Sequence, residues 1–241
     1  DMGRWLAGKT CDYPVAGARH RTRRARPPGT RLTPHLPQRL RDSTRELHTL
    51  SERAGVMADL IHGRLPRERY ALLLRNLHAL YAALETALQQ QPAHASWTLV
   101  DHPAQHRRAT LEADLRVLHG DAWSEDLPLA PAMAAYESRL QALCAAASPA
   151  LVAHVYTRSL GDLHGGQILQ QRVARMLALP DQQGTAFYDF GPEPTVLALR
   201  QRLRLALAQL PATAAEEDCI VAEACWSFQQ HVALFSELTR L

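Results

Sequence analysis

Residues 156–169 read YTRSLGDLHGGQIL, and this stretch decides the fold. The apolar residues around it recur at helical spacing, yet it contains three glycines, Gly161, Gly165 and Gly166. Each glycine costs about 1 kcal/mol of helix stability relative to alanine. Glycine also lets a backbone approach a flat ligand with no Cβ in between, and helices bend at glycine clusters. Because the acid Asp162 lies among these glycines, the stretch predicts a bent helix that covers a planar cofactor.

The stretch YTRSLGDLHGGQIL resembles the glycine-rich distal helix of the biliverdin-forming heme oxygenases. A second stretch, LRDSTRELHTLSERAGVM at residues 40–57, resembles the proximal helix of the same family, which carries the histidine bound to iron. The two motifs have the family's order and separation, and the likeness extends from about Leu40 to Leu241. The resemblance implies an enzyme that converts heme, dioxygen and electrons into biliverdin, carbon monoxide and ferrous iron.

The composition fits a single folded domain preceded by a basic tail. The chain has 241 residues, 46% of them hydrophobic, and no apolar run approaches the roughly 20 residues of a membrane span. Residues 1–39 hold nine Lys or Arg and two acids, and they contain five prolines and no hydrophobic period. We therefore expect a disordered tail over residues 1–39 and a helical domain over residues 40–241. The four cysteines form no CxxC pair, which favours a cytoplasmic protein.

After Pro37 the apolar spacing is helical throughout, and no strand alternation is found. The sequence therefore predicts an all-α protein, a single compact bundle of about seven helices, and the resemblance implies heme sandwiched between the proximal and distal helices. The expected helices cover residues 40 to about 63, 66 to about 91, 111 to 120, 136 to 148, 150 to 178, 194 to 209 and 213 to 239.

On the proximal helix, Arg41, Arg45, His48 and Glu52 are spaced by four, three and four residues and share one face. A neutral imidazole is a common axial ligand of heme iron, and its other ring nitrogen needs an acceptor. The resemblance places the iron ligand on His48, this acceptor on Glu52 and a contact to a heme propionate on Arg41. From composition alone, one of 12 histidines is more often a surface or core residue than a ligand.

On the distal helix, the resemblance makes Asp162 the anchor of a water network that delivers protons to the bound oxygen. It makes Gly161 and Gly165 the wall close to the porphyrin, and we expect Gly166 to contact the cofactor as well. Arg158 is expected to tie the network together, and Tyr156 to add a hydroxyl. Ordinary helix packing is the alternative for these last two residues.

One position departs from the family, because His164 stands where the family has a small hydroxyl residue. We expect His164 to join the water network or to pack against another helix, rather than to bind the iron. His102 and His106 are also four residues apart. No acid or cysteine is expected beside them, so no metal site is predicted there.

Two arginines, Arg200 and Arg204, lie four apart on an otherwise apolar helix and suit an edge-bound carboxylate. Their spacing to the C-terminal FSEL matches the family's propionate-binding positions, with Arg202 facing elsewhere; a solvated face is the alternative. The resemblance also places Met57 and Phe228 in the walls of the heme site.

The expected cofactor is heme b, which is also the substrate, together with O2 and an external electron donor, a reductase or a ferredoxin. A biliverdin acceptor is a further candidate partner, and we expect a monomer. The alternative function is a non-enzymatic heme carrier, which would not need Asp162 among its glycines. A basic segment at residues 19–31 raises nucleic-acid binding as a third hypothesis, but a solvated extension explains it more simply, so no nucleic-acid partner is predicted.

Overall fold

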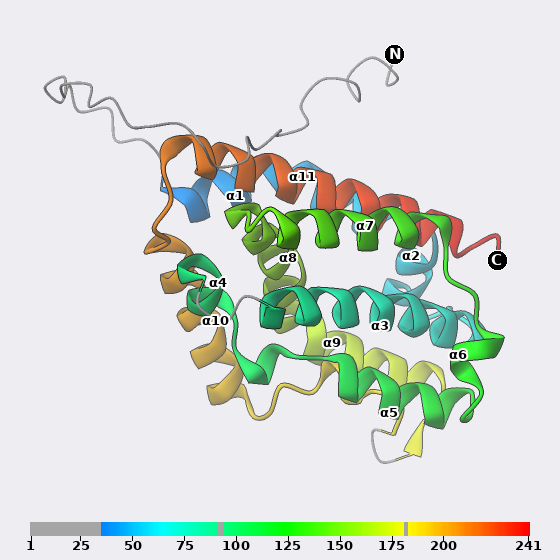
Figure 1. The fold of residues 1–241 in the computed structure, drawn as a ribbon. Helices are drawn as coiled ribbons and strands as arrows, with labels where there is room; N and C mark the ends of the chain where they lie inside the picture. Colours follow the sequence, from blue (N-terminus) through cyan, green and yellow to red (C-terminus); the bar gives the residue numbers. More distant parts are fainter. Residues whose placement is uncertain (1–34, 91–93, 181–182) are drawn as a thin grey trace, which may run out of the picture.

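The computed structural model describes residues 35–90, 94–180 and 183–241, so most of the predicted N-terminal tail lies outside the described residues. The described part contains helices and no strand, and the predicted all-α class is confirmed (Figure 1). The helices are α1 (Leu36–Glu52), α2 (Gly55–Ile61), α3 (Arg67–Gln90), α4 (Ala95–Val100), α5 (Arg108–Leu118), α6 (Trp123–Asp126), α7 (Pro131–Ala145), α8 (Val152–Val155), α9 (Gly161–Met176), α10 (Glu193–Ala208) and α11 (Ala214–Glu237). Short turns are η2 (Pro103–Gln105), η3 (Pro149–Leu151) and η6 (Ala186–Tyr188), and η4 (Tyr156–Leu160) is a π-helical segment.

The first predicted helix differs from the structure at both ends. It begins at Leu36, before the predicted boundary at residue 40, because Pro37 sits in the first turn, where its missing N–H costs nothing. It also ends at Glu52, and α2 starts separately at Gly55, whose φ is +39°. A Cβ on Gly55 would lie 1.9 Å from the carbonyl oxygen of Phe235. The break at Gly55 therefore lets the chain approach the backbone of α11 more closely than any other residue would allow.

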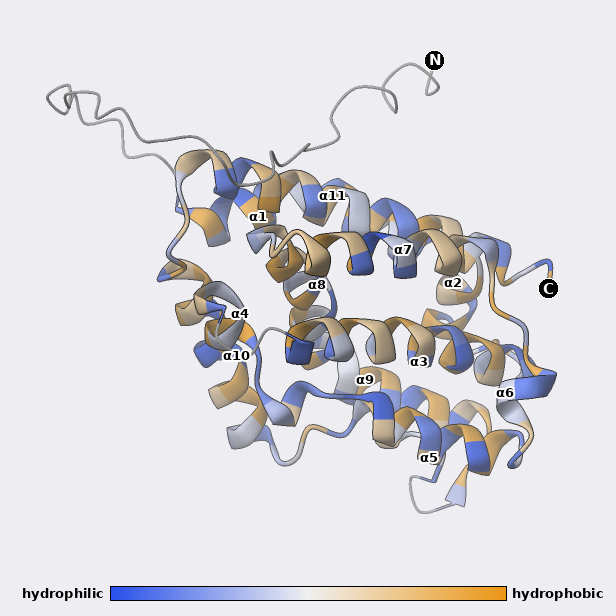
Figure 2. Ribbon diagram, in the orientation of Figure 1, coloured by the Kyte–Doolittle hydropathy of each residue, from blue (hydrophilic) through white to orange (hydrophobic). Residues whose placement is uncertain are grey.

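The helices form two packed groups that share a core. The long helix α1 packs along α11, and α3 packs between α5 and α7 (Figure 1). Because α11 also contacts α7 and α8, the two groups are joined. Hydrophilic and hydrophobic turns alternate along α5 and α11, as expected for helices with one solvated face (Figure 2). The large apolar residues that recur at helical spacing along α3 are all buried: Tyr70, Leu73, Leu77, Leu80, Leu84 and Leu88.

The glycine-rich stretch is a helix whose geometry changes along its length. It starts as η3, continues as α8, widens into the π-helical η4 and becomes regular again as α9 at Gly161. A π-helical turn is rare and is frequently found at functional sites. The irregular turn thus lies directly before the glycines, where the sequence predicts a bend.

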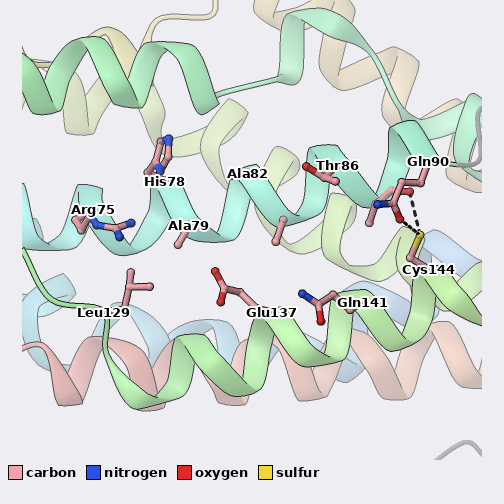
Figure 3. Close-up of a pocket in the computed structure, with 12 residues that line it drawn as sticks. Arg75, His78, Ala79, Ala82, Thr86, Gln90, Leu129, Glu137, Gln141 and Cys144 are labelled. Carbon is pink, nitrogen blue, oxygen red and sulfur yellow. Dashed lines mark hydrogen bonds between the residues drawn. The ribbon is translucent and has the colours of Figure 1, made fainter. Parts of the chain in front are cut away.

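A groove of about 440 Å³ runs between α3 and α7. Small side chains such as Ala79 and Ala82 line its middle, and Cys144 closes one end through a contact of 3.1 Å between its Sγ and Oε1 of Gln90 (Figure 3). The groove is a consequence of alanines at a helix–helix contact. Tyr81, which belongs to the site described below, is not part of its lining. In the described ranges, no helix is both long and apolar enough to cross a membrane.

Candidate functional site

Two of the three predicted glycines leave the surface of α9 open. A Cβ added to Gly161 or Gly165 would meet no atom within 4 Å among the described residues, apart from chain neighbours and the helix itself. His48 of α1 lies close enough to His164 of α9 to affect the pKa of that ring. The bare backbone of α9 and the imidazole of α1 are therefore brought to the same part of the molecule, as the sequence predicts.

His48 is held loosely on the proximal side. Its side chain is 51% exposed, and its Nδ1 lies 3.8 Å from Oε1 of Glu52, which is longer than a hydrogen bond. Its ring packs edge-on against Phe228 of α11, with centroids 5.7 Å apart. Arg41 is exposed, with its Nε 3.6 Å from Oδ1 of Asp42, and Met57 is half-buried against the core. Glu52 is thus near the imidazole, as expected, but the two groups are not hydrogen-bonded.

Asp162 is held firmly on the distal side. Nη2 of Arg158 donates to both carboxylate oxygens, at 2.7 and 3.0 Å, and the hydroxyl of Tyr81 donates to Oδ2. Burial alone would lower the pKa of Arg158, but attraction to Asp162 and Tyr81 more than offsets it and raises the pKa above its usual range. Burial, followed by the negative charge of Asp162, also raises the pKa of Tyr81. The arrangement keeps Arg158 charged and Tyr81 protonated, so both act as donors to the carboxylate.

The tyrosine in this cluster is not the one that the sequence predicted. The hydroxyl of Tyr156 lies 3.2 Å from Oγ1 of Thr44 on α1, so it links the distal segment to the proximal helix instead of joining Asp162. Tyr81 comes from α3 and was missed because it lies within an apolar helical pattern. The sequence did offer one indication of a role for Tyr81: a tyrosine within a buried helix usually has a hydrogen-bond partner for its hydroxyl.

Gly166 does not share the open face of Gly161 and Gly165, contrary to the prediction that all three glycines face the cofactor. A Cβ at Gly166 would lie 3.3 Å from the carbonyl oxygen of Tyr188 and 3.8 Å from the ring of Phe190. Gly166 is therefore on the buried side of α9, where it allows the helix to pack closely on the segment around η6. The spacing explains this result, because adjacent residues of a helix point about 100° apart.

The two predicted arginines of α10 reach the glycine-rich helix. Arg200 donates from Nε to the carbonyl oxygen of Leu163 at 2.9 Å, and Nη2 of Arg204 lies 2.9 Å from Nε2 of His164. Arg202 points elsewhere, as expected, and donates to the carbonyl oxygen of Asp101. Positive charge is thus gathered beside the open face of α9.

His164 has a packing role in this arrangement. Its Nδ1 donates to the carbonyl oxygen of Leu160 at 2.6 Å, which leaves Nε2 to accept from Arg204. Burial, followed by the nearby charges of Arg200, Arg204 and His48, lowers its pKa. Both ring nitrogens therefore have partners, one on η4 and one on α10, and neither is free to bind iron.

These residues fit a flat, negatively charged metal complex. One imidazole offers a single ligand on one side, open glycine backbone forms the other side, and two guanidinium groups lie beside it. A metalloporphyrin with carboxylate side chains satisfies each of these features. The fold and the site define a class of helical protein whose residues on α1, α9 and α10 fit such a cofactor.

Comparisons with known proteins agree with this class. The sequence model of the family described as heme oxygenase matches residues 34–237. Heme oxygenase 1 of a Nostoc species is 34% identical over 86% of this chain and 87% of its own length, and human heme oxygenase 1 is 34% identical over 90% and 76%. Among solved structures, heme oxygenase-2 of Synechocystis, in complex with heme and NO, matches with a TM-score of 0.81 and 34% identity over 85% of each chain. The chain therefore belongs to the heme oxygenase family, a family of enzymes.

Proposed function

We propose that the chain binds heme between α1 and α9 and cleaves it with dioxygen and reducing equivalents to biliverdin, carbon monoxide and ferrous iron. Membership of the heme oxygenase family supports the reaction class. The observation that carries the assignment of the site is Asp162, fixed by Arg158 and Tyr81 directly beside the open glycines.

On the proximal side, His48 is the residue that would bind the iron, and Glu52 is placed one turn away to accept from the other ring nitrogen. Heme, when bound, supplies the iron that activates dioxygen. Arg41, Arg200 and Arg204 would pair with its carboxylates, because guanidinium groups grip carboxylates through two parallel hydrogen bonds. Met57 and Phe228 would add apolar walls.

On the distal side, Gly161 and Gly165 allow the substrate to lie close to the backbone of α9. Asp162 orients water that carries protons to the reacting oxygen, since a positioned proton donor accelerates such a step by roughly 10²–10⁴-fold. Arg158 and Tyr81 donate hydrogen bonds that hold the Asp162 carboxylate in place. The carboxylate therefore acts through water and is not itself a strong acid above the reacting atoms.

The proposed reaction also needs an electron donor and a route for its product. We assign the electron supply to an external reductase or ferredoxin and the product to a biliverdin acceptor, with the enzyme acting as a cytoplasmic monomer. A heme carrier is the less favoured alternative. The relatives cited above are named heme oxygenases, and a carrier has no use for a carboxylate held by two buried donors.

A single-turnover assay tests the proposal. The purified chain is loaded with hemin, reductant and oxygen are added with catalase present, and the Soret band is followed by absorbance. We expect the band to disappear as biliverdin absorbance rises, and the same mixture without reductant should stay unchanged. A Soret band that persists with reductant, with no verdin product, would assign the chain to heme carriage instead.

A further inference from the structure

A small cavity lies beside the distal segment, where Val155 and Ser159 form part of its lining. It leaves about 10 Å³ for the centre of a water molecule, which is close to the room that one water needs. Its walls come from α3, from the segment around η2 and from η4. The polar lining residues are Tyr81, Glu85, Asp101, Gln105, His106 and Ser159.

Gln105 is the unusual member of this lining. Only 5% of the residue is exposed, yet neither its amide oxygen nor its amide nitrogen has a hydrogen-bond partner within the described ranges. Buried amide groups without partners are rare and costly, and ordered water is the common remedy. Two unsatisfied atoms beside a space of one-water size therefore point to a bound water.

The outer end of the cavity reaches the surface through a titratable pair. Nε2 of His106 lies 2.7 Å from Oδ1 of Asp101, and the two side chains are 26% and 29% exposed. This hydrogen bond raises the pKa of His106 despite partial burial, with Glu85 adding to the increase and Arg107 opposing it. The prediction that no acid lies near His106 is wrong, because Asp101 supplies one. Because both side chains are partly exposed, the pair can take up protons from solvent.

At its inner end the cavity reaches Tyr81, which is one of the two residues bonded to Asp162. Tyr81 lines the cavity and also donates its hydroxyl hydrogen bond to Asp162. Ser159, which is 5% exposed, also lines the cavity and belongs to the π-helical η4. The cavity thus touches a solvent-exchanging pair on one side and a donor to Asp162 on the other.

We propose that Gln105 binds a water molecule in this cavity, and that this water passes protons from the His106–Asp101 pair at the surface to Tyr81 and hence to Asp162. One proton enters at His106 for each proton that Tyr81 transfers to Asp162, so Tyr81 and the water end each cycle unchanged. The catalytic value of this path rests on the proposed role of Asp162, but the water site does not.

The water site is tested in the heme-free chain with Gln105→Met, an apolar replacement of similar length. The matched control is Gln38→Met, because Gln38 is exposed on α1. A crystal structure of the wild-type chain should show water within hydrogen-bond distance of the Gln105 amide, and Gln105→Met should lose it. Since removing an unpaired buried amide stabilises a protein, a dry cavity predicts a higher melting temperature for Gln105→Met. No increase is expected here; a dry cavity and a higher melting temperature would overturn the proposal.

The relay is tested by NMR and by turnover. Exchange of the Tyr81 hydroxyl proton with solvent, measured in the heme-free chain, should be slower in Gln105→Met and in His106→Gln than in Gln38→Met. Biliverdin formation should fall by about tenfold in both variants, less than the roughly 10²-fold or more of a directly positioned acid, while hemin affinity stays constant. Unchanged exchange in both variants would remove the relay. If the wild-type chain made no biliverdin, the proposed function would fail, and the exchange rates would still decide the path.

Discussion

His48 on the proximal side has half of its side chain exposed and no hydrogen bond to Glu52, whereas Asp162 on the distal side is 10% exposed and bonded to two donors. The proximal group is free to adjust when a ligand binds. The distal group is fixed before any ligand arrives, and such preorganised polar groups are the ones that favour a reaction over binding alone. We therefore expect α1 to contribute mainly to binding, and η4 and α9 to contribute mainly to the control of the chemistry.

The largest effect on the reaction is expected from removing the carboxylate of Asp162 on the distal side. Asp162→Ala should keep hemin affinity within a few-fold of wild type and lower the rate of biliverdin formation by about 10²–10⁴-fold. The measurement is single-turnover absorbance next to a hemin titration. Asp121→Ala is the control, because the Asp121 side chain is almost fully exposed on another face. A normal biliverdin yield from Asp162→Ala would remove this carboxylate from the reaction.

Removing the imidazole of His48 on the proximal side should instead weaken the binding of hemin. His48→Ala should weaken hemin retention by at least the roughly 10- to 100-fold that losing a supporting partner of a metal ligand costs. Its ferric spectrum should shift, and added imidazole should restore it. His119→Ala serves as a control, since His119 pairs with Asp126 away from the site. An unchanged spectrum for His48→Ala would move the iron ligand to another histidine.

Gly165 and Gly166 are neighbours in α9 but have different surroundings, so their variants should behave differently. Gly165→Ala should stabilise the heme-free chain by about 1 kcal/mol through helix propensity, while hemin affinity falls because the new methyl group enters the open space. Gly166→Ala should leave hemin affinity unchanged and gain less stability, because Tyr188 must shift to admit the Cβ. Melting temperatures and hemin titrations of both variants give the result. Equal hemin affinities in the two variants would place the cofactor elsewhere.

These glycines also show how far the sequence alone could lead. The helical class, the pairing of His48 with a glycine-rich helix and the direction of Arg200 and Arg204 follow from periodicity and from the family resemblance. The sequence could not distinguish Gly166 from its neighbours, because the side of α9 that packs on η6 is set by distant contacts. For the same reason it missed Tyr81 and misplaced Tyr156, whose partners lie 81 and 112 residues away along the chain.

The smallest effect is expected at His164, between the two sides. Its folded-state pKa lies below the usual 6.5, so its contribution to stability is complete above about pH 6.5 and is lost as the pH falls through the folded-state value. The bond from Arg204 is lost at the same time, because a protonated ring has no free acceptor. His164→Ser should therefore be less stable than wild type near pH 8, by less than about 1 kcal/mol as for other exposed pairs, and the difference should shrink toward pH 5.

Urea titrations at several pH values measure this difference, with His62→Ser as a matched control. His62 makes the same contact as His164, from Nδ1 to the carbonyl oxygen four residues earlier, at the same 2.6 Å. Only the His164 variant should therefore report on Arg204. A difference that grows as the pH falls would mean that the ring is protonated in the folded chain. Arg204 would then have no bond to His164 in the heme-free chain and would be free to pair with the cofactor. In that case the distal side, like the proximal side, would contain a group that can adjust when the ligand binds.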